Sequence, residues 1–248
     1  MSEIYPRVGI PKSTTHRILA TLTKGGLLGY DVTEERYSVG PALFALGSLY
    51  LTTNNLQSVA GPVLRAINDL TEESPAIAVL DEKGNITFVM REESKHALKV
   101  GFRVGLSSPA FAHALGKALL SELTDDEIDI LYPEEKLPPL TNKTVPTRTH
   151  LKRELEEIRK TGVAYVDEQA LEGVEAVAAL IRDQHGKAVA AVAIGVPAVR
   201  MNESRREIFA EMVKLGAALI NYRLGYQAPS VSIRNLEDLR SGWERLNA

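Results

Sequence analysis

The chain has 248 residues, of which 44% are hydrophobic and 25% are charged, and it contains no cysteine. This length and apolar content favour two domains with a sizeable core, and the lack of cysteine excludes disulfides and thiolate metal sites, which fits a reducing compartment. The formal net charge is −3, yet residues 1–30 hold four basic residues and only one acidic residue. The N-terminus is therefore basic and the remainder acidic, a distribution that suits a nucleic-acid-binding segment joined to another domain.

Residues 9–28 carry the most informative pattern of the sequence. A Gly-Ile turn and a proline precede a helical pattern that two glycines end, which predicts a helix over residues 11–24. Apolar periodicity assigns Thr15, Ile18, Leu19 and Leu22 to a packed face. The opposite face then carries Lys12, Ser13, Thr14, His16, Arg17 and Thr21. Small hydroxyls with one Lys and one Arg suit contacts with phosphates and base edges in a DNA groove.

The flanking residues complete a winged helix-turn-helix. Residues 2–8 are interpreted as the end of a preceding helix, and residues 27–30 and 36–39 as two strands around a polar turn. Arg36 near the tip of this wing is expected to reach a phosphate or the minor groove. The sequence starts inside the motif, so we expect the small core to lack part of its cover. An upstream segment, a neighbouring subunit or impaired DNA binding would each account for this.

Residues 42–51 form an apolar helix with no polar face, which must be covered on all sides. A partner subunit is the preferred cover, because two-fold symmetry supplies a second DNA half-site. Burial within its own domain is the alternative. Two asparagines end this helix, and an amphipathic helix over residues 56–72 begins the next domain.

The rest of the chain mixes strands and helices. Two hairpins are predicted, over residues 77–90 and 174–196, and single strands over residues 97–104 and 163–166. The predicted helices span residues 111–123, 125–131 (with Thr124 and Glu127 as a capping box), 149–160 and 204–224. This order favours an α+β domain in which helices cover an antiparallel sheet. In the tail, Leu236, Leu239, Trp243 and Leu246 share one face of a short helix that docks on the sensor domain or on a partner.

The sequence resembles the IclR family of bacterial transcription regulators. The resemblance lies in residues 9–17 (GIPKSTTHR), 36–41 (RYSVGP) and 114–120 (ALGKALL), and in Gly173, Arg182, Asp183 and Gly186, in the family's order. It implies a winged helix-turn-helix over residues 1–40, a linker and dimerisation helix over 41–55, and a GAF-like effector-binding domain over 56–226, with residues 227–248 as a tail. It further implies a homodimer or a dimer of dimers that binds operator DNA through Lys12, Ser13, Thr14, His16, Arg17 and Arg36.

The resemblance also implies an effector site beside the helix that begins near Phe111. The positions carried over are Phe111, His113, Ala114, Leu115, Asp167, Ala176, Ala193 and Gly195. Helix N-termini favour carboxylates, so a small organic acid is expected. Ala176 stands where the family usually has Cys, and Ala193 and Gly195 where it usually has Ser, which favours an aromatic or medium-chain acid. Ordinary packing of Phe111 and His113 is the alternative to ligand contact.

Other function classes find little support in the sequence. Ser107, Ser108, His113 and Asp167 suggest a catalytic triad, but no nucleophile elbow accompanies them, so we expect no enzyme. The five histidines lack metal-ligand spacing and no phosphate-binding loop is present, so we expect neither a metal nor a cofactor. With no signal or membrane-spanning pattern, a cytoplasmic location without membrane attachment is expected. A small-molecule binding module with an impaired DNA-binding domain remains the alternative function.

Overall fold

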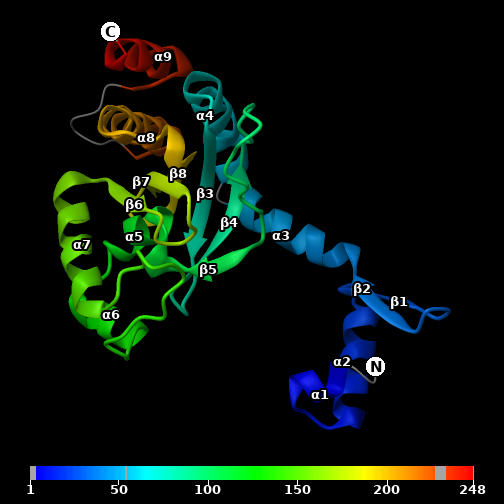
Figure 1. The fold of residues 1–248 in the computed structure, drawn as a ribbon. Coiled ribbons are helices and arrows are strands. Elements are labelled where there is room, and N and C mark those ends of the chain that lie inside the picture. The colour runs from blue at the N-terminus through cyan, green and yellow to red at the C-terminus, as the bar shows by residue number, and fades with distance from the viewer. Residues whose placement is uncertain (1–3, 54, 227–232, 248) are drawn as a thin grey trace. The chain divides into compact units, whose positions relative to one another are not determined.

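The computed structural model describes residues 4–53, 55–226 and 233–247. The chain divides into two compact units, Met1–Leu56 and Gln57–Ala248 (Figure 1). Among the described residues, no helix is long and apolar enough to cross a membrane.

The first unit contains the predicted helix-turn-helix and wing. Its elements are α1 (Ile4–Val8), α2 (Lys12–Lys24), β1 (Leu28–Asp31), β2 (Arg36–Val39) and α3 (Pro41–Thr53). The turn between α1 and α2 contains Gly9, whose φ of 67° lies in the region that favours glycine. α2 begins one residue later than predicted, since Pro11 precedes the helix as its N-cap. Thr15 and Leu19 are buried as expected, whereas Ile18 is 44% exposed, so only part of the predicted packed face is covered within the chain.

The wing is an antiparallel pair in which Leu28 is opposite Val39 and Asp31 is opposite Arg36. Asp31 holds the turn, because its Oδ1 accepts hydrogen bonds from the backbone N–H groups of Thr33 and Glu34 at 2.8 and 3.0 Å. The rings of Tyr30 and Tyr37 lie 4.7 Å apart across the two strands. These contacts hold the hairpin that carries Arg36.

The second unit is an α+β fold, as predicted (Figure 1). Its strands are β3 (Ser74–Leu80), β4 (Asn85–Arg91), β5 (Ser107–Pro109), β6 (Ala164–Asp167), β7 (Val174–Arg182) and β8 (Ala188–Pro197). Its helices are α4 (Leu56–Thr71), α5 (Ala114–Leu120), α6 (Asp125–Leu131), α7 (Arg148–Thr161), α8 (Glu203–Arg223) and α9 (Leu236–Leu246), with 3₁₀ turns η1 (Ala110–Ala112) and η2 (Ala198–Arg200).

The strands described in this unit pair in the order β5-β4-β3-β8-β7-β6, and each neighbouring pair is antiparallel. Because side chains alternate along a strand, one face of the sheet carries a run of small residues. These are Ala76, Ala78, Ala178, Ala191 and Ala193, all buried in a core cluster with α5. The small side chains let α5 lie close to this face of the sheet. Another helix, α8, contacts strands β7 and β8. We call this run of alanines, with Ala176 and Gly195 at its end, the alanine face.

Local signals in the sequence locate several helix ends correctly. Thr124 and Glu127 form the predicted capping box at the start of α6, and Gly162, with a φ of 73°, ends α7. The predicted tail helix is α9, which packs on α8: Leu239 is fully buried and the rings of Trp243 and Phe209 stack with centroids 6.3 Å apart. Residues 227–232 and 248 of the tail lie outside the described residues.

Two predicted elements are wrong. The strand expected over residues 97–104 does not form, because β5 takes the place beside β4 at that edge of the sheet. The helix expected from Phe111 begins only at Ala114, after η1 and the extended residue His113. The extended backbone of His113 (φ −108°, ψ 142°) interrupts the helix. The turn before it packs back on α5, since a Cβ on Gly116 would lie 2.1 Å from the carbonyl oxygen of Ala110.

Candidate functional site

The exposed face of α2 presents most of the predicted DNA-binding residues. Lys12, Ser13, His16 and Arg17 are exposed and Thr14 is half-buried. Pro11 provides no side-chain cap, so the N–H groups of the first turn of α2 have no capping acceptor. Free N–H groups and a basic side chain at a helix N-terminus are well suited to bind a phosphate.

Arg36 is the predicted DNA contact on the wing. Its side chain is 81% exposed, and its guanidinium lies 3.9 Å from the carboxylate of Glu34, which is 62% exposed. An ion pair this exposed contributes little free energy. Arg36 can therefore exchange Glu34 for a phosphate at small cost.

In the second unit, three predicted effector residues form one row on the sheet. Ala176 of β7 is directly opposite Gly195 of β8, and Ala193 is two residues along the same strand. Ala114 and Leu115 of α5 are buried in the same core cluster as Ala193, and Ala176 packs against that cluster. The structure therefore brings five of the eight predicted effector residues to the alanine face.

Phe111 belongs to the same cluster but faces another neighbour. Its ring meets that of Tyr132 edge to face, with centroids 5.6 Å apart, and only 2% of the residue is exposed. Tyr132 in turn donates a hydrogen bond from its hydroxyl to the carbonyl oxygen of Gly84 at 2.8 Å. For Phe111, the geometry fits ordinary packing against Tyr132.

His113 directly precedes α5, the helix that packs on the alanine face. Its Nε2 lies 2.8 Å from the Oγ of Ser108, and its ring meets the ring of Phe88 edge-on at 5.8 Å. Burial, and to a lesser extent the charge of nearby Lys117, lowers the pKa of His113 to about 4. At neutral pH the imidazole is therefore uncharged, so one ring nitrogen can donate a hydrogen bond and the other can accept one.

Asp167 lies apart from the other predicted effector residues. It follows Val166, whose side chain belongs to the core cluster, so strand alternation directs Asp167 to the opposite side. Its carboxylate accepts a hydrogen bond from Nζ of Lys143 at 2.9 Å. The imagined triad is consequently incomplete: Ser108 and His113 are hydrogen-bonded to each other, while the described partner of Asp167 is Lys143.

Phe102 and Val100 are neighbours of the site that the sequence did not reveal. A Cβ on Gly195 would lie 2.5 Å from Cζ of Phe102 and 3.3 Å from Cγ1 of Val100, so both side chains cover the glycine. The rings of Phe102 and Phe88 stack with centroids 5.1 Å apart. Alternation of Val100, Phe102 and Val104 suggested a strand, and no sequence signal indicated that this segment crosses the alanine face.

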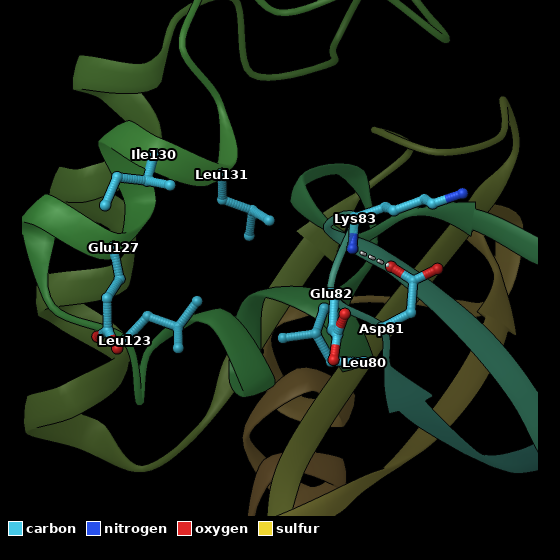
Figure 2. Close-up of a pocket in the computed structure, with 8 residues that line it drawn as sticks. All are labelled: Leu80, Asp81, Glu82, Lys83, Leu123, Glu127, Ile130 and Leu131. Atoms are coloured by element: carbon cyan, nitrogen blue, oxygen red, sulfur yellow. Dashed lines mark hydrogen bonds between the residues drawn. The ribbon is translucent and has the colours of Figure 1, made fainter.

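A separate hollow of about 350 Å³ lies between the β3–β4 turn and α6 (Figure 2). Its lining residues are Leu80, Asp81, Glu82, Lys83, Leu123, Glu127, Ile130 and Leu131, none of which is a predicted effector residue. Two of its carboxylates are already engaged, since Asp81 accepts N–H groups of the turn and Glu127 caps α6. In the part of the chain that the structure describes, no group of three or more His, Cys, Asp or Glu side chains could hold a metal ion.

Comparison with known families identifies both units. The family model described as "Bacterial transcriptional regulator IclR C-terminal" matches residues 48–222, and the "IclR helix-turn-helix domain" matches residues 1–32. The chain belongs to the IclR family. The sequence resemblance and the fold predicted from it are thereby confirmed, including the α+β unit with its GAF-like antiparallel sheet.

Individual relatives agree with this assignment. The transcriptional repressor IclR of Escherichia coli (strain K12) is 29% identical over 226 residues, which cover 91% of this chain and 82% of that protein. The HTH-type transcriptional repressor AllR of Salmonella paratyphi A is 30% identical over 230 residues, 92% of this chain and 84% of that protein. Since the relatives are named transcription regulators, the protein is a DNA-binding regulator of the IclR type, with a regulatory rather than a catalytic role.

Solved structures share the fold. An IclR homologue from Microbacterium hydrocarbonoxydans was solved in complex with 4-hydroxybenzoate. It has a TM-score of 0.76 at 24% identity, and the match covers 90% of this chain and 90% of that one. A transcriptional regulator from Rhodococcus sp. RHA1 has a TM-score of 0.74 at 28% identity, with coverage of 90% of this chain and 89% of that one.

Proposed function

We propose that this IclR-type regulator reads operator DNA with α2 and the wing, and that a small aromatic or medium-chain acid bound at the alanine face controls it. Residues 1–40 would be the DNA-binding domain, 41–55 the linker helix, 56–226 the effector-binding domain and 227–248 a tail. The observation that carries the DNA-binding part is the exposed face of α2, where Lys12, Ser13, His16 and Arg17 surround an uncapped helix N-terminus.

The proposed DNA contacts divide by position. The N-terminal turn of α2 would enter the major groove, with Arg17 and His16 toward base edges and Lys12, Ser13 and Thr14 toward phosphates. Arg36 of the wing, whose ion pair with Glu34 is exposed, would bind the adjacent backbone or minor groove.

A gel-shift titration of the full chain with duplex from its own promoter region tests this assignment. Arg17→Ala should weaken binding by about 1–3 kcal/mol and relax sequence preference if Arg17 reads a base. Lys24→Ala is the matched control, because it removes the same charge from the opposite end of α2. Equal mobility of the wild type and Arg17→Ala would contradict the assignment, and no DNA binding by either would favour a binding module without DNA-binding function.

We propose that α3 joins two copies of the chain. In this helix Leu43, Phe44 and Leu46 are 42%, 80% and 56% exposed within a single chain, and large apolar side chains exposed on one helix favour burial against a partner. A two-fold pair would also align two α2 helices with the half-sites of an operator. Sedimentation analysis should give a dimer or a dimer of dimers, and Phe44→Glu should shift the mass toward the monomer.

The proposed effector class rests on the chemistry of the alanine face. Ala176, Ala193 and Gly195 offer no side-chain hydrogen bond, so a compact polar acid would lose solvation without compensation there. Uncharged His113 and the N–H groups at the start of α5 can bind one polar end of the ligand. The complex of 4-hydroxybenzoate with a relative of the same fold is consistent with an aryl carboxylate.

A thermal-shift screen of carboxylates tests the class, since a ligand that binds only the folded state raises Tm. Benzoate, phenylacetate and hexanoate should raise Tm, whereas glyoxylate and pyruvate should not. Ala176→Ser and Ala193→Ser should shift the preference toward small polar acids. Stabilisation by small keto acids alone would contradict an apolar site.

A further inference from the structure

The side chain of Phe102 fills the space above Gly195 on the alanine face. A Cβ at residue 195 would meet Cζ of Phe102 at 2.5 Å and Cε2 at 2.8 Å, closer than side chains approach one another. The ring therefore lies on the glycine backbone itself, in the volume that a side chain at this position would otherwise use. Only glycine at this position permits the contact without a shift.

The ring of Phe102 also lies against a second aromatic ring, that of Phe88. The two rings stack with an interplanar angle of 28°. The ring of Phe88 also meets the ring of His113 edge-on, and Nε2 of His113 is hydrogen-bonded to Ser108. The ring of Phe102 thus lies between the ring of Phe88 and the backbone of Gly195, and the uncharged His113 is a second neighbour of Phe88. This is the geometry expected of a subsite for an aryl group.

The segment that carries Phe102 is anchored on both sides of it. Before it, the carbonyl oxygen of Leu98 accepts a hydrogen bond from Arg200 at 2.9 Å. After it, the N–H of Gly105 donates to the carbonyl oxygen of Phe88 at 2.8 Å, and the N–H of Phe88 donates to that of Leu106 at 3.1 Å. Among the described residues, the backbone groups of residues 99–102 make no hydrogen bond to other backbone groups. This stretch can therefore move without breaking a backbone hydrogen bond.

We propose that Phe102 is an internal occupant of the effector site, which the aromatic ring of the ligand displaces. This inference rests on the proposed effector function of the alanine face. In the unliganded state Phe102 covers Gly195; in the bound state the ligand ring lies on Gly195 beside Phe88, and Phe102 swings outward on the 99–102 stretch. There it would join the exposed side chains of Leu98, Val104 and Leu106.

Displacement of this kind sets the apparent affinity and links binding to a change of surface. The ligand can bind only when the side chain of Phe102 has left the site. The apparent affinity is therefore the intrinsic affinity multiplied by the fraction of molecules in that state. Removing the ring should therefore strengthen binding of an aryl acid, the opposite of what removing a wall of the pocket would do. The outward movement changes an exposed apolar surface, which a second domain or subunit can sense.

The test is calorimetric titration of benzoate into four forms of the full chain: the wild type, Phe102→Ala, Val104→Ala and Gly195→Val. Phe102→Ala should bind benzoate about tenfold or more tightly than the wild type. Val104→Ala is the matched control, since Val104 lies on the same segment but is 58% exposed, and it should bind as the wild type does. Gly195→Val places a side chain in the space above residue 195 where the ligand ring would lie, so it should abolish binding. Phe102→Leu, which retains bulk, provides an intermediate if the alanine variant unfolds.

The outcomes separate the two proposals. If the wild type binds benzoate, Gly195→Val does not, and Phe102→Ala binds equally or more weakly, then Phe102 is a pocket wall and the displacement inference is overturned while the effector site stands. Phe102→Leu decides in the same way where Phe102→Ala does not fold. If Gly195→Val binds as the wild type does, or no form binds a carboxylate, both proposals fail. If Ile130→Glu weakens benzoate binding instead, the ligand binds in the hollow beside α6. That result would overturn both the effector site at the alanine face and the displacement of Phe102.

Discussion

The carboxylate of Glu73 accepts two hydrogen bonds from the guanidinium of Arg200, at 2.8 Å from Nε and 2.6 Å from Nη2. Glu73 is 1% exposed, while the side chain of Arg200 is 22% exposed. Because Arg200 also donates to the carbonyl oxygen of Leu98, this pair fixes one end of the segment that carries Phe102. Arg200 therefore links Glu73, which directly precedes β3, to the segment whose Phe102 lies over Gly195.

Arg200→Met should be strongly destabilising, because it leaves the buried carboxylate of Glu73 without its main counter-charge. Loss of one partner of a buried pair costs about 3–5 kcal/mol. Urea unfolding measures this loss. Arg205→Met is the control: Arg205 lies 3.8 Å from Glu73 and its side chain is 42% exposed, so its loss should cost less than about 1 kcal/mol. Equal effects of the two variants would contradict the assignment of Arg200 as the main partner.

His113 should make stability depend on pH below neutrality. Its pKa is about 4 in the folded protein, against an ordinary 6.5, so between these values the unfolded chain binds a proton that the folded protein does not. The contribution is thus fully present above pH 6.5 and is lost as pH falls toward 4, up to about 3 kcal/mol.

Urea unfolding of the wild type and His113→Asn at pH 7, 5.5 and 4 checks this expectation. Whatever the substitution costs at pH 7, the advantage of the wild type should shrink as pH falls. The exposed residue His185 provides the control, since His185→Asn should leave the pH profile unchanged. A pH-independent difference between the wild type and His113→Asn would rule out an uncharged buried imidazole.

Local chemistry made much of the fold predictable, and long-range packing accounts for the errors. Thr124 with Glu127, and Gly162, act within one helical turn, so the ends of α6 and α7 were predicted closely. The alternating apolar residues over 97–104 fit a strand equally well, but whether a strand forms depends on an open sheet edge, and β5 pairs with β4 there. The interruption of the predicted helix at His113 likewise accompanies a packing contact, the approach of Gly116 to Ala110.

The same distinction applies to the site. Ala176, Ala193 and Gly195 were predicted from the family pattern, and their common row follows from strand register. Asp167 was grouped with them, although alternation directs it toward Lys143. Phe102 was missed because its contact with Gly195 joins segments far apart in the chain, and neither residue alone carries a local signal of it.

Lys117 provides a further prediction, since it is a fully buried lysine whose Nζ donates to Glu154 and Gln169. Burial lowers the pKa of Lys117, and Glu154 opposes this shift. Glu154→Gln should cost about 1–3 kcal/mol, because the ammonium loses its charged acceptor. Lys117→Met, of similar shape, should cost less than Glu154→Gln and should remove most of the penalty in the double variant.

Chemical denaturation of the two single variants and the double variant gives the coupling between Lys117 and Glu154. Glu156→Gln is the control on the same helix, because Glu156 pairs with Lys160 at an exposed position, 62% and 57% exposed. It should change the free energy of unfolding by about 0.5 kcal/mol or less. Additive effects of Lys117→Met and Glu154→Gln would show that the two side chains do not interact in solution.

The docking of α9 on α8 should be visible in the fluorescence of Trp243, the single tryptophan of the sequence. Trp243 stacks on Phe209, and Leu239 is fully buried on the same side of α9. Leu239→Ala removes the buried aliphatic contact at a cost of about 2–5 kcal/mol. We expect α9 to detach before the sheet unfolds, so that Trp243 enters water and its emission shifts to longer wavelength while far-UV dichroism of the main unit is largely kept.

Arg240→Ala, at an exposed position of the same helix, should leave the emission unchanged. If Leu239→Ala keeps the wild-type emission maximum and acrylamide quenching, the contact between α8 and α9 does not depend on Leu239 and the tail is held in another way.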